Sequence, residues 1–494
     1  MCKGPEVEGE LGQRGTSQLL INFKLHTQPF SLFWQQPCCY WPINIMYVSS
    51  RPSSRSELWL EAFGDHEFLC STSHEHYGRP CCVPREDVLT GGAVVWEDVS
   101  EVGSSLSGII NAEKSEFNED QAACGQLCIR RCEFGAEEDQ EWLTLCAEEF
   151  LTGHYWALFD GHGGPAAAIL AANTLHSCLR RQLEAVVEGM VALQPPMHLS
   201  GRCVCPSDPQ FVEEKGIRAE DLVIGALENA FQECDEVIGR ELEASGQVGG
   251  CTALVAVFLQ GKLYVANAGD SRAILVRKDE VRPLSSEFTP ETERQRIQQL
   301  AFVYPELLAG EFTRLEFPRR LKGDDLGQKV LFRDHHMRGW SYKCVEKSDL
   351  KYPLIHGQGR QARLLGTLAV SRGLGDHQLR VLDTNIQLKP FLLSVPQVTV
   401  LDVDQLELQE EDVVVMATDG LWDVLSNEQV ARLVRSFLPG NQEDPHRFSE
   451  LAKMLIHSTQ GKDDGPTGEG QVSYDDISVF VIPLHSQGQR SSGH

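Results

Sequence analysis

Residues 155–164 read Tyr155-Trp156-Ala157-Leu158-Phe159-Asp160-Gly161-His162-Gly163-Gly164, an apolar run that meets a glycine-rich turn at Asp160. The five aromatic and aliphatic residues predict a buried β-strand. The glycines after it allow the backbone to turn tightly. A helix is expected next, because residues 166–190 carry apolar side chains at intervals of three and four.

The regions that follow alternate helix and strand signals. A second helix is predicted around 219–242, and a third is predicted to open at Thr289-Pro290-Glu291 and run to about Leu300. Gln260-Gly261 lies between two β-rich runs, a pattern typical of a hairpin. Strands are predicted at 252–259, 262–267, 364–370, 395–403, 412–418 and 477–484.

The chain divides by composition into four parts. Residues 1–90 show no sustained periodicity and predict a poorly ordered leader, and 486–494 form a polar tail. A single domain is expected over 91–485, with an insertion at about 304–363 that holds 12 Lys or Arg against 8 Asp or Glu. The local basic excess fits either a solvated surface lobe or a place where substrates dock.

Charge and cysteine content restrict the partners and the location. The 494 residues carry a formal net charge of -27, which disfavours nucleic acid and anionic membranes as partners. The apolar stretch 30–48 is interrupted by Gln, Pro and Asn, so no membrane span is expected. Sixteen cysteines without a secretory signal indicate free thiols in a reducing compartment. We therefore expect a cytoplasmic or nuclear protein that is not secreted.

Several acidic residues share one context, since each lies where an apolar strand meets a polar or glycine-containing turn. They are Glu119, Asp120, Asp160, Asp270, Asp419, Asp423 and Asp475. A buried carboxylate is costly unless it is paired or binds metal, so the repetition predicts a shared cation. Hard oxygen ligands favour Mg²⁺ or Mn²⁺. Two such ions roughly 4 Å apart can activate a water, and His162, two residues after Asp160, is a candidate proton donor because histidine is a common general acid.

Seven motifs between about residues 110 and 484 resemble those of the metal-dependent protein phosphatases, the protein phosphatase 2C class, and they occur in that family's order. They are Asn118-Glu119-Asp120, Phe159-Asp160-Gly161-His162-Gly163-Gly164, Gly249-Gly250-Cys251-Thr252-Ala253, Asn267-Ala268-Gly269-Asp270-Ser271-Arg272, Leu368-Ala369-Val370-Ser371-Arg372-Gly373-Leu374-Gly375-Asp376, Ala417-Thr418-Asp419-Gly420-Leu421-Trp422-Asp423 and Tyr474-Asp475-Asp476-Ile477-Ser478. The resemblance implies an α/β four-layer sandwich, in which helices flank two central antiparallel sheets. The long basic insertion is similar to that of the subgroup with an enlarged flap.

The resemblance also implies a role for each acidic residue. Asp160 would bridge two metal ions and Gly161 would offer its carbonyl oxygen. Asp419 and Asp475 would complete one site, and Glu119 would hold the other ion through water. Asp120 would support this metal-binding network, and Asp270 and Asp423 would be ligands of a weaker third ion. His162 would be the general acid. Structural roles are implied for Thr252, Arg272 and Arg372.

One position departs from the family pattern. Family members commonly carry an arginine four residues before the motif glutamate, where it clasps the substrate phosphate, and this chain has Ser115 there. Lys114 is the nearest cation and can bind phosphate as a point charge. We therefore take Lys114 as the candidate for phosphate binding.

The predicted function is hydrolysis of phosphoserine and phosphothreonine in proteins by a water that two metal ions activate. The alternative is a pseudophosphatase that binds phosphoproteins without turnover, which the missing arginine keeps open. A two-metal nuclease would need the carboxylates as well, but the acidic charge disfavours it. We expect a monomer and leave a dimer open.

Overall fold

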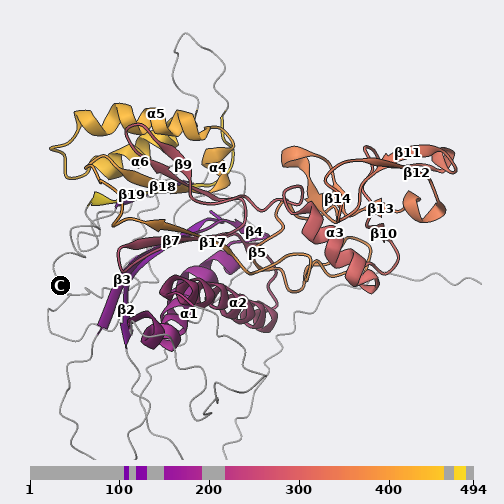
Figure 1. Ribbon diagram of the computed structural model, residues 1–494, viewed down its shortest axis with the longest axis horizontal. Helices are drawn as coiled ribbons and strands as arrows, with labels where there is room; N and C mark the ends of the chain where they lie inside the picture. The colour runs from indigo at the N-terminus through magenta and orange to yellow at the C-terminus, as the bar shows by residue number, and fades with distance from the viewer. Residues whose placement is uncertain (1–104, 111–117, 131–149, 192–216, 461–471, 486–494) are drawn as a thin grey trace, which may run out of the picture. The chain divides into compact units, whose positions relative to one another are not determined.

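The structure is a computed structural model that describes residues 105–110, 118–130, 150–191, 217–460 and 472–485 (Figure 1). The predicted leader and polar tail lie outside the described residues. The domain boundaries therefore remain predictions.

Two antiparallel five-stranded sheets form the centre of the described region. The first sheet has the strand order β17-β7-β6-β3-β2 and the second has the order β1-β19-β18-β8-β9. The first consists of β2 (Gln121–Arg130), β3 (Phe150–Phe159), β6 (Ala253–Leu259), β7 (Lys262–Ala268) and β17 (Gln397–Asp402). The second consists of β1 (Ser105–Ile110), β8 (Arg272–Val276), β9 (Val281–Pro283), β18 (Val413–Ala417) and β19 (Ile477–Pro483).

The central strands are apolar on both faces because each sheet is covered on both sides. In β6, Val255 and Val257 pack toward the helices, while Leu254 and Phe258 pack between the two sheets. In β18 the same alternation sends Met416 between the sheets. This two-sided burial explains why the strands read as continuous apolar runs rather than as alternating ones.

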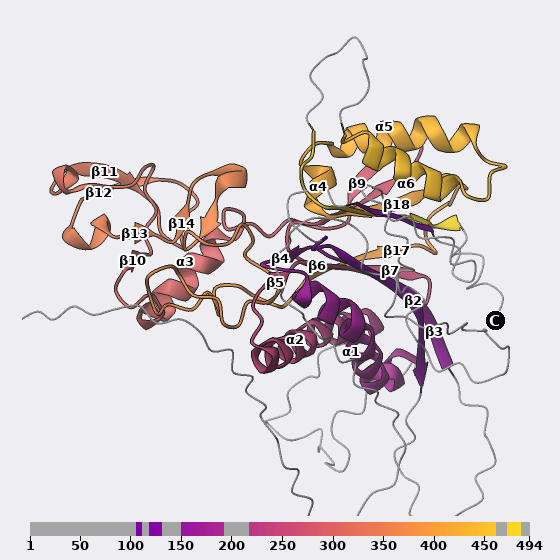
Figure 2. The ribbon, with the colours of Figure 1, turned by 180° about the vertical axis from the view of Figure 1, so that it is seen from behind.

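Helices complete the four layers (Figures 1 and 2). The helices α1 (Ala166–Val191) and α2 (Ala219–Ser245) share an apolar core with the first sheet. The helices α5 (Asn427–Phe437) and α6 (Arg447–His457) share one with the second sheet. A third core lies between the sheets. The predicted four-layer sandwich is thereby confirmed.

The hairpin predicted at Gln260-Gly261 is present between β6 and β7. Both turn residues have positive φ, 49° and 71°, as the two-residue turn that fits twisted strands requires. A separate short sheet joins β4 (Gly161–His162), β5 (Gly250–Cys251) and β16 (Leu374–Gly375). This short sheet brings distant motifs to one place beside the first sheet.

Helix α3 (Arg294–Val303) leads into the region of the predicted insertion, which consists of short elements. They are η1 (Pro305–Leu308), β10 (Phe312–Thr313), η2 (Gly323–Asp325), β11 (Lys329–Phe332), β12 (Ser341–Cys344), η3 (Lys347–Leu350), β13 (Tyr352–Pro353), β14 (Ile355–His356), η4 (Gly359–Gln361) and β15 (Arg363–Leu364). A fourth apolar core joins α3 to residues as far along the chain as Leu392. No helix of the described region is long and apolar enough to cross a membrane.

One predicted boundary and one predicted element are wrong. The third helix is present, but it begins at Arg294 rather than after Thr289, because residues 290–293 form turns. The side chain of Thr289 still accepts a hydrogen bond from the amide of Thr292 at 3.3 Å. This is the contact expected of a helix cap, although no helix begins there. The strand predicted at 364–370 is a turn after β15, since Leu365 has a φ of 49° and packs into the fourth core.

Candidate active site

Three aspartates from three elements meet at one edge of the two sheets. Asp160 follows β3, Asp270 follows β7, and Asp419 begins the short helix α4 (Asp419–Trp422) after β18. Neighbouring antiparallel strands alternate direction, so alternate strand ends lie on the same edge. One carboxylate oxygen from each of the three lies within 4.8 Å of the other two.

The closeness of these carboxylates perturbs their protonation. Burial raises the pKa of Asp160 well above its usual value, and the charges of Asp419, Asp120 and Asp270 raise it further. Burial and the charge of Asp419 do the same for the pKa of Asp270. Burial and mutual repulsion therefore both favour the protonated form of Asp160 and Asp270 when no metal ion is bound.

The donor set fits a hard divalent cation. All three convergent ligands are carboxylate oxygens, which Mg²⁺ and Mn²⁺ prefer. A cation placed among them would offset the repulsion that raises the pKa of Asp160 and Asp270. The three carboxylates could therefore hold a metal ion, and the assignment of the individual ligands stays a prediction.

Asp120 is buried behind this group. Its Oδ2 accepts hydrogen bonds from Thr418 Oγ1 at 2.9 Å and from Ser478 Oγ at 2.7 Å, while its Oδ1 has no hydrogen-bond partner among the described residues. Burial raises its pKa to about 8 against the lowering effect of Ser478 and Thr418. Asp120 therefore links the end of β18 to β19 through these two hydrogen bonds.

Glu119 and Gly161 are fixed to each other. The Gly161 amide donates to the backbone oxygen of Glu119 at 3.2 Å, and the Gly164 amide donates to Glu119 Oε1 at 2.7 Å. A Cβ at Gly161 would lie 2.4 Å from the Glu119 backbone oxygen. Glycine is therefore required at this position by close backbone approach.

The remaining predicted ligands are Asp475 and Asp423. Asp475 lies just before β19, and its charge helps to raise the pKa of Asp160. Asp423 follows α4 and is half exposed, and its Oδ1 lies 3.1 Å from Arg360 Nη1. Arg360, from η4, also donates to the backbone oxygen of Asp423 at 2.7 Å. The insertion thus contacts the edge of the acidic group through this arginine.

His162, the predicted proton donor, lies on β4 next to the acidic group. Its Nε2 is 2.7 Å from Oδ2 of Asp376, whose side chain is 2% exposed. The sequence analysis did not single out Asp376. Like the other acidic residues, Asp376 lies at the end of a strand, β16, where it follows an apolar residue and a glycine. The same sequence pattern could therefore have identified it.

The other motif residues have structural partners. Thr252 Oγ1 lies 3.1 Å from Ser271 Oγ, Arg272 pairs with Glu287, and Arg372 donates to Glu293 at 2.7 Å. These contacts agree with the structural roles implied for Thr252, Arg272 and Arg372.

Lys114 and Ser115, the positions at which phosphate binding departs from the family pattern, lie outside the described residues. The assignment of Lys114 to phosphate binding therefore stays a prediction.

The insertion contains a cavity of about 780 Å³ apart from the acidic group. Its lining includes six cationic and three acidic side chains: Arg294, Arg314, Arg319, Arg320, Arg333, Lys351, Glu291, Glu316 and Asp349. The guanidinium of Arg320 lies 3.9 Å from the centre of the Tyr352 ring. No acidic partner of Arg320 or Lys351 is found within the described region.

Comparison with known proteins identifies close relatives. The family model described as Protein phosphatase 2C matches residues 202–314 and 354–461, and the gap between the matches falls within the predicted insertion. Protein phosphatase 1M of Mus musculus is 87% identical over 417 residues, which cover 84% of this chain and 89% of the relative. Protein phosphatase 1H of Mus musculus is 44% identical, with 85% and 91% covered. Protein phosphatase 1J of Rattus norvegicus is 43% identical, with 85% and 84% covered.

Proposed function

The chain belongs to the protein phosphatase 2C family, and on this premise we propose that the carboxylates around Asp160 bind two divalent ions, Mn²⁺ or Mg²⁺. The protein is a serine/threonine protein phosphatase, and proteins carrying phosphoserine or phosphothreonine are its substrates. No observation favours the alternative of a pseudophosphatase.

We propose a role in metal binding for each of the acidic residues and for Gly161. Asp160 would be a ligand of both ions, Gly161 would contribute its carbonyl oxygen, and Asp419 and Asp475 would complete one site. Glu119 would help to hold the second ion, and Asp120 would support that network. Asp270 and Asp423 would hold a weaker third ion. When bound, the ions supply a water acidic enough to attack phosphorus near neutral pH.

The protein's own side chains act on the two ends of the scissile bond. His162 is proposed to donate a proton to the serine or threonine oxygen as it leaves, since it lies on β4 only two residues after Asp160. Lys114 is proposed to hold the phosphate. Substituting Lys114→Ala should raise the KM for a phosphopeptide with little change in kcat, and an unchanged KM would contradict this assignment.

The convergence of Asp160, Asp270 and Asp419 within 4.8 Å is the observation that carries the proposal. The test is hydrolysis of a phosphothreonine peptide by the purified protein with and without Mn²⁺, repeated with Asp160→Ala and Asp419→Ala. We expect activity to require the metal and to fall by at least about 10²-fold in both variants. If hydrolysis persisted in the presence of a chelator and in both variants, the proposed mechanism would be wrong.

The cavity in the insertion favours the docking role over the solvated lobe. Its cationic lining would attract acidic residues that flank the phosphorylated residue of a protein substrate. Arg320→Glu should raise the KM for an acidic phosphopeptide several-fold without changing kcat. Arg338→Glu, an exposed cation outside the cavity, is the matched control, and equal effects of the two substitutions would contradict the docking role.

We further propose that the protein works in the cytoplasm, the nucleus or both. The six described cysteines are free thiols, the state typical of reducing compartments. Fluorescence imaging of the tagged protein tests the location, and a secreted pool would contradict it. A monomer is proposed as the working form, and light scattering after size exclusion measures it.

A further inference from the structure

A buried carboxylate stands behind the proposed proton donor. We propose that Asp376 is a positioning residue that holds the imidazole of His162 in the orientation needed to protonate the leaving oxygen. This inference rests on the proposed role of His162. Within the described residues, Asp376 is the one hydrogen-bond partner of that ring.

The contact fixes which ring nitrogen pairs with Asp376. A carboxylate accepts hydrogen bonds, so Nε2 of His162 carries the hydrogen that points to Asp376 Oδ2 at 2.7 Å. Donation to a substrate oxygen then comes from the imidazolium form of the ring, in which Nδ1 carries a second hydrogen. A carboxylate paired with the far nitrogen of a histidine holds both the tautomer and the ring orientation.

Each strand of the short sheet contributes one part of this arrangement. His162 lies on β4, Gly250 on β5, and Asp376 directly follows β16. A Cβ at Gly250 would lie 2.2 Å from Asp376 Oδ2 and 2.8 Å from His162 Nε2. The glycine backbone therefore packs against the histidine and aspartate pair and leaves no room for a side chain.

The backbone around Asp376 is held in an uncommon conformation. Gly375 and Asp376 have positive φ, 86° and 57°. The Gly375 amide donates to Oδ1 of Asp235 in α2 at 2.8 Å, and the Asp376 amide donates to the Gly249 oxygen at 2.9 Å. Lys389 and His377 hold Asp235 in turn. Such a conformation persists only where its surroundings fix it, and this one aims the carboxylate at His162.

Aspartate also tolerates positive φ better than most residues, which offers a purely structural reason for its presence. Asn and Gly tolerate the same conformation, so replacing Asp376 by either one separates the backbone requirement from the carboxylate. Asp383 provides a matched control, since it has a φ of 60° and is exposed.

The reaction step defines what to measure. The bond from phosphorus to the serine or threonine oxygen breaks while water adds its oxygen to phosphorus. The leaving oxygen takes the proton from His162, which regains one from solvent, and Asp376 stays a hydrogen-bond acceptor throughout. A phosphothreonine peptide needs this proton, whereas p-nitrophenyl phosphate releases a weakly basic phenolate that does not.

The experiment measures kcat and KM on both substrates for the wild type, Asp376→Asn, Asp376→Gly, His162→Ala, His162→Ala with Asp376→Asn, and Asp383→Asn. Both Asp376 variants should lose at least about 10-fold in kcat on the phosphopeptide, with an unchanged KM and less than about 3-fold loss on p-nitrophenyl phosphate. The double variant should match His162→Ala, because residues that act as one unit are not additive. Asp383→Asn should behave as the wild type.

Three outcomes overturn the inference. Equal losses on both substrates would assign Asp376 a general structural role, and an additive loss in the double variant would show that it acts independently of His162. If His162→Ala alone spares the phosphopeptide, the proposed role of His162 fails together with this inference. If His162→Ala is selective and the Asp376 variants are not, the proposed function stands and only this inference falls. Melting temperatures with and without Mn²⁺ establish that every variant is folded and binds metal.

Discussion

At the scale of single residues, Asp120 shows how the site depends on its cation. It is buried, it receives two hydroxyl hydrogen bonds, and its neighbours Asp476 and Asp419 add negative charge. Burial is the largest cause of its raised pKa. Without metal, therefore, part of the folding free energy depends on whether this carboxyl keeps its proton.

We predict the direction of this dependence. The folded state keeps the Asp120 proton up to about pH 8, whereas the unfolded state loses it near 3.8. The folded state binds more protons in that window, so stability falls as the pH rises through it and levels off above it. In chelator, the wild-type Tm should fall by about 5 °C or more between pH 5 and pH 8. Asp120→Asn should show a shallower fall, and equal slopes would contradict the prediction.

The sequence predicted the convergent acids but not their neighbours. Asp160, Asp270 and Asp419 were found because each follows an apolar strand. Thr418 and Ser478 were not, because their bonds to Asp120 join residues 298 and 358 positions apart and leave no local pattern. Long-range partners of this kind need the sheet order, which periodicity does not supply.

At the scale of secondary-structure elements, local signals succeeded where an element packs along its whole length. The apolar spacing of α1 and α2 reflects a shared core with the first sheet. The signals failed at 290–293, where turns replace the predicted start of the helix, and at 365–370, where Leu365 and Val370 fill the fourth core without forming a strand. The spacing of apolar residues in the sequence indicates which side chains are buried. Burial alone does not distinguish a strand from a turn.

Replacing each of two glycines of α2 by alanine should change the stability of the protein in opposite directions. A Cβ at Gly225 would meet nothing within 4 Å, whereas one at Gly239 would lie 2.7 Å from Cδ2 of His377. Gly225→Ala should stabilise the protein by roughly 0.5–1 kcal/mol, because alanine favours helix. Gly239→Ala should destabilise it by about 1–3 kcal/mol through overpacking. Denaturant midpoints measure both, and the same sign for the two variants would contradict the packing seen around His377.

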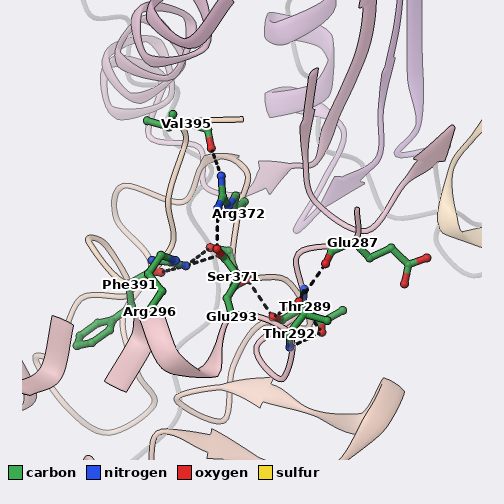
Figure 3. Close-up of polar contacts among 9 residues, drawn as sticks. All are labelled: Glu287, Thr289, Thr292, Glu293, Arg296, Ser371, Arg372, Phe391 and Val395. Carbon is green, nitrogen blue, oxygen red and sulfur yellow. Dashed lines mark hydrogen bonds and ion pairs between the residues drawn. The ribbon is translucent and has the colours of Figure 1, made fainter. Parts of the chain in front are cut away.

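At the scale of the whole molecule, a polar cluster anchors the start of α3, the helix that leads into the insertion (Figure 3). Glu293 lies just before α3 and accepts hydrogen bonds from Arg296 and Arg372 at 2.7 Å and from Ser371 at 3.0 Å. Burial alone would raise the pKa of Glu293, but the two arginines lower it below its usual value. Ser371 and Arg372 precede Asp376 in one motif, so the cluster connects the start of α3 with the segment that carries the partner of His162.

We predict that this cluster stabilises the enzyme strongly. Glu293→Gln leaves two partly buried arginines without a charged partner and should lower the free energy of unfolding by roughly 2–4 kcal/mol. Glu306→Gln, at an exposed position in η1, should change it by less than about 0.5 kcal/mol. Thermal unfolding in the presence of Mn²⁺ compares the two. A loss for Glu293→Gln no larger than for Glu306→Gln would contradict the anchoring role.

The place of β19 has a consequence for synthesis of the protein. This strand comes late in the chain, yet it lies between β1 and β18 in the second sheet, and Ser478 from it bonds Asp120. The ribosome therefore synthesises β1, β8, β9 and β18 before the strand that joins β1 to β18 exists. We expect nascent chains to remain inactive toward phosphoproteins until this strand emerges, so that phosphatase activity begins only with a finished fold.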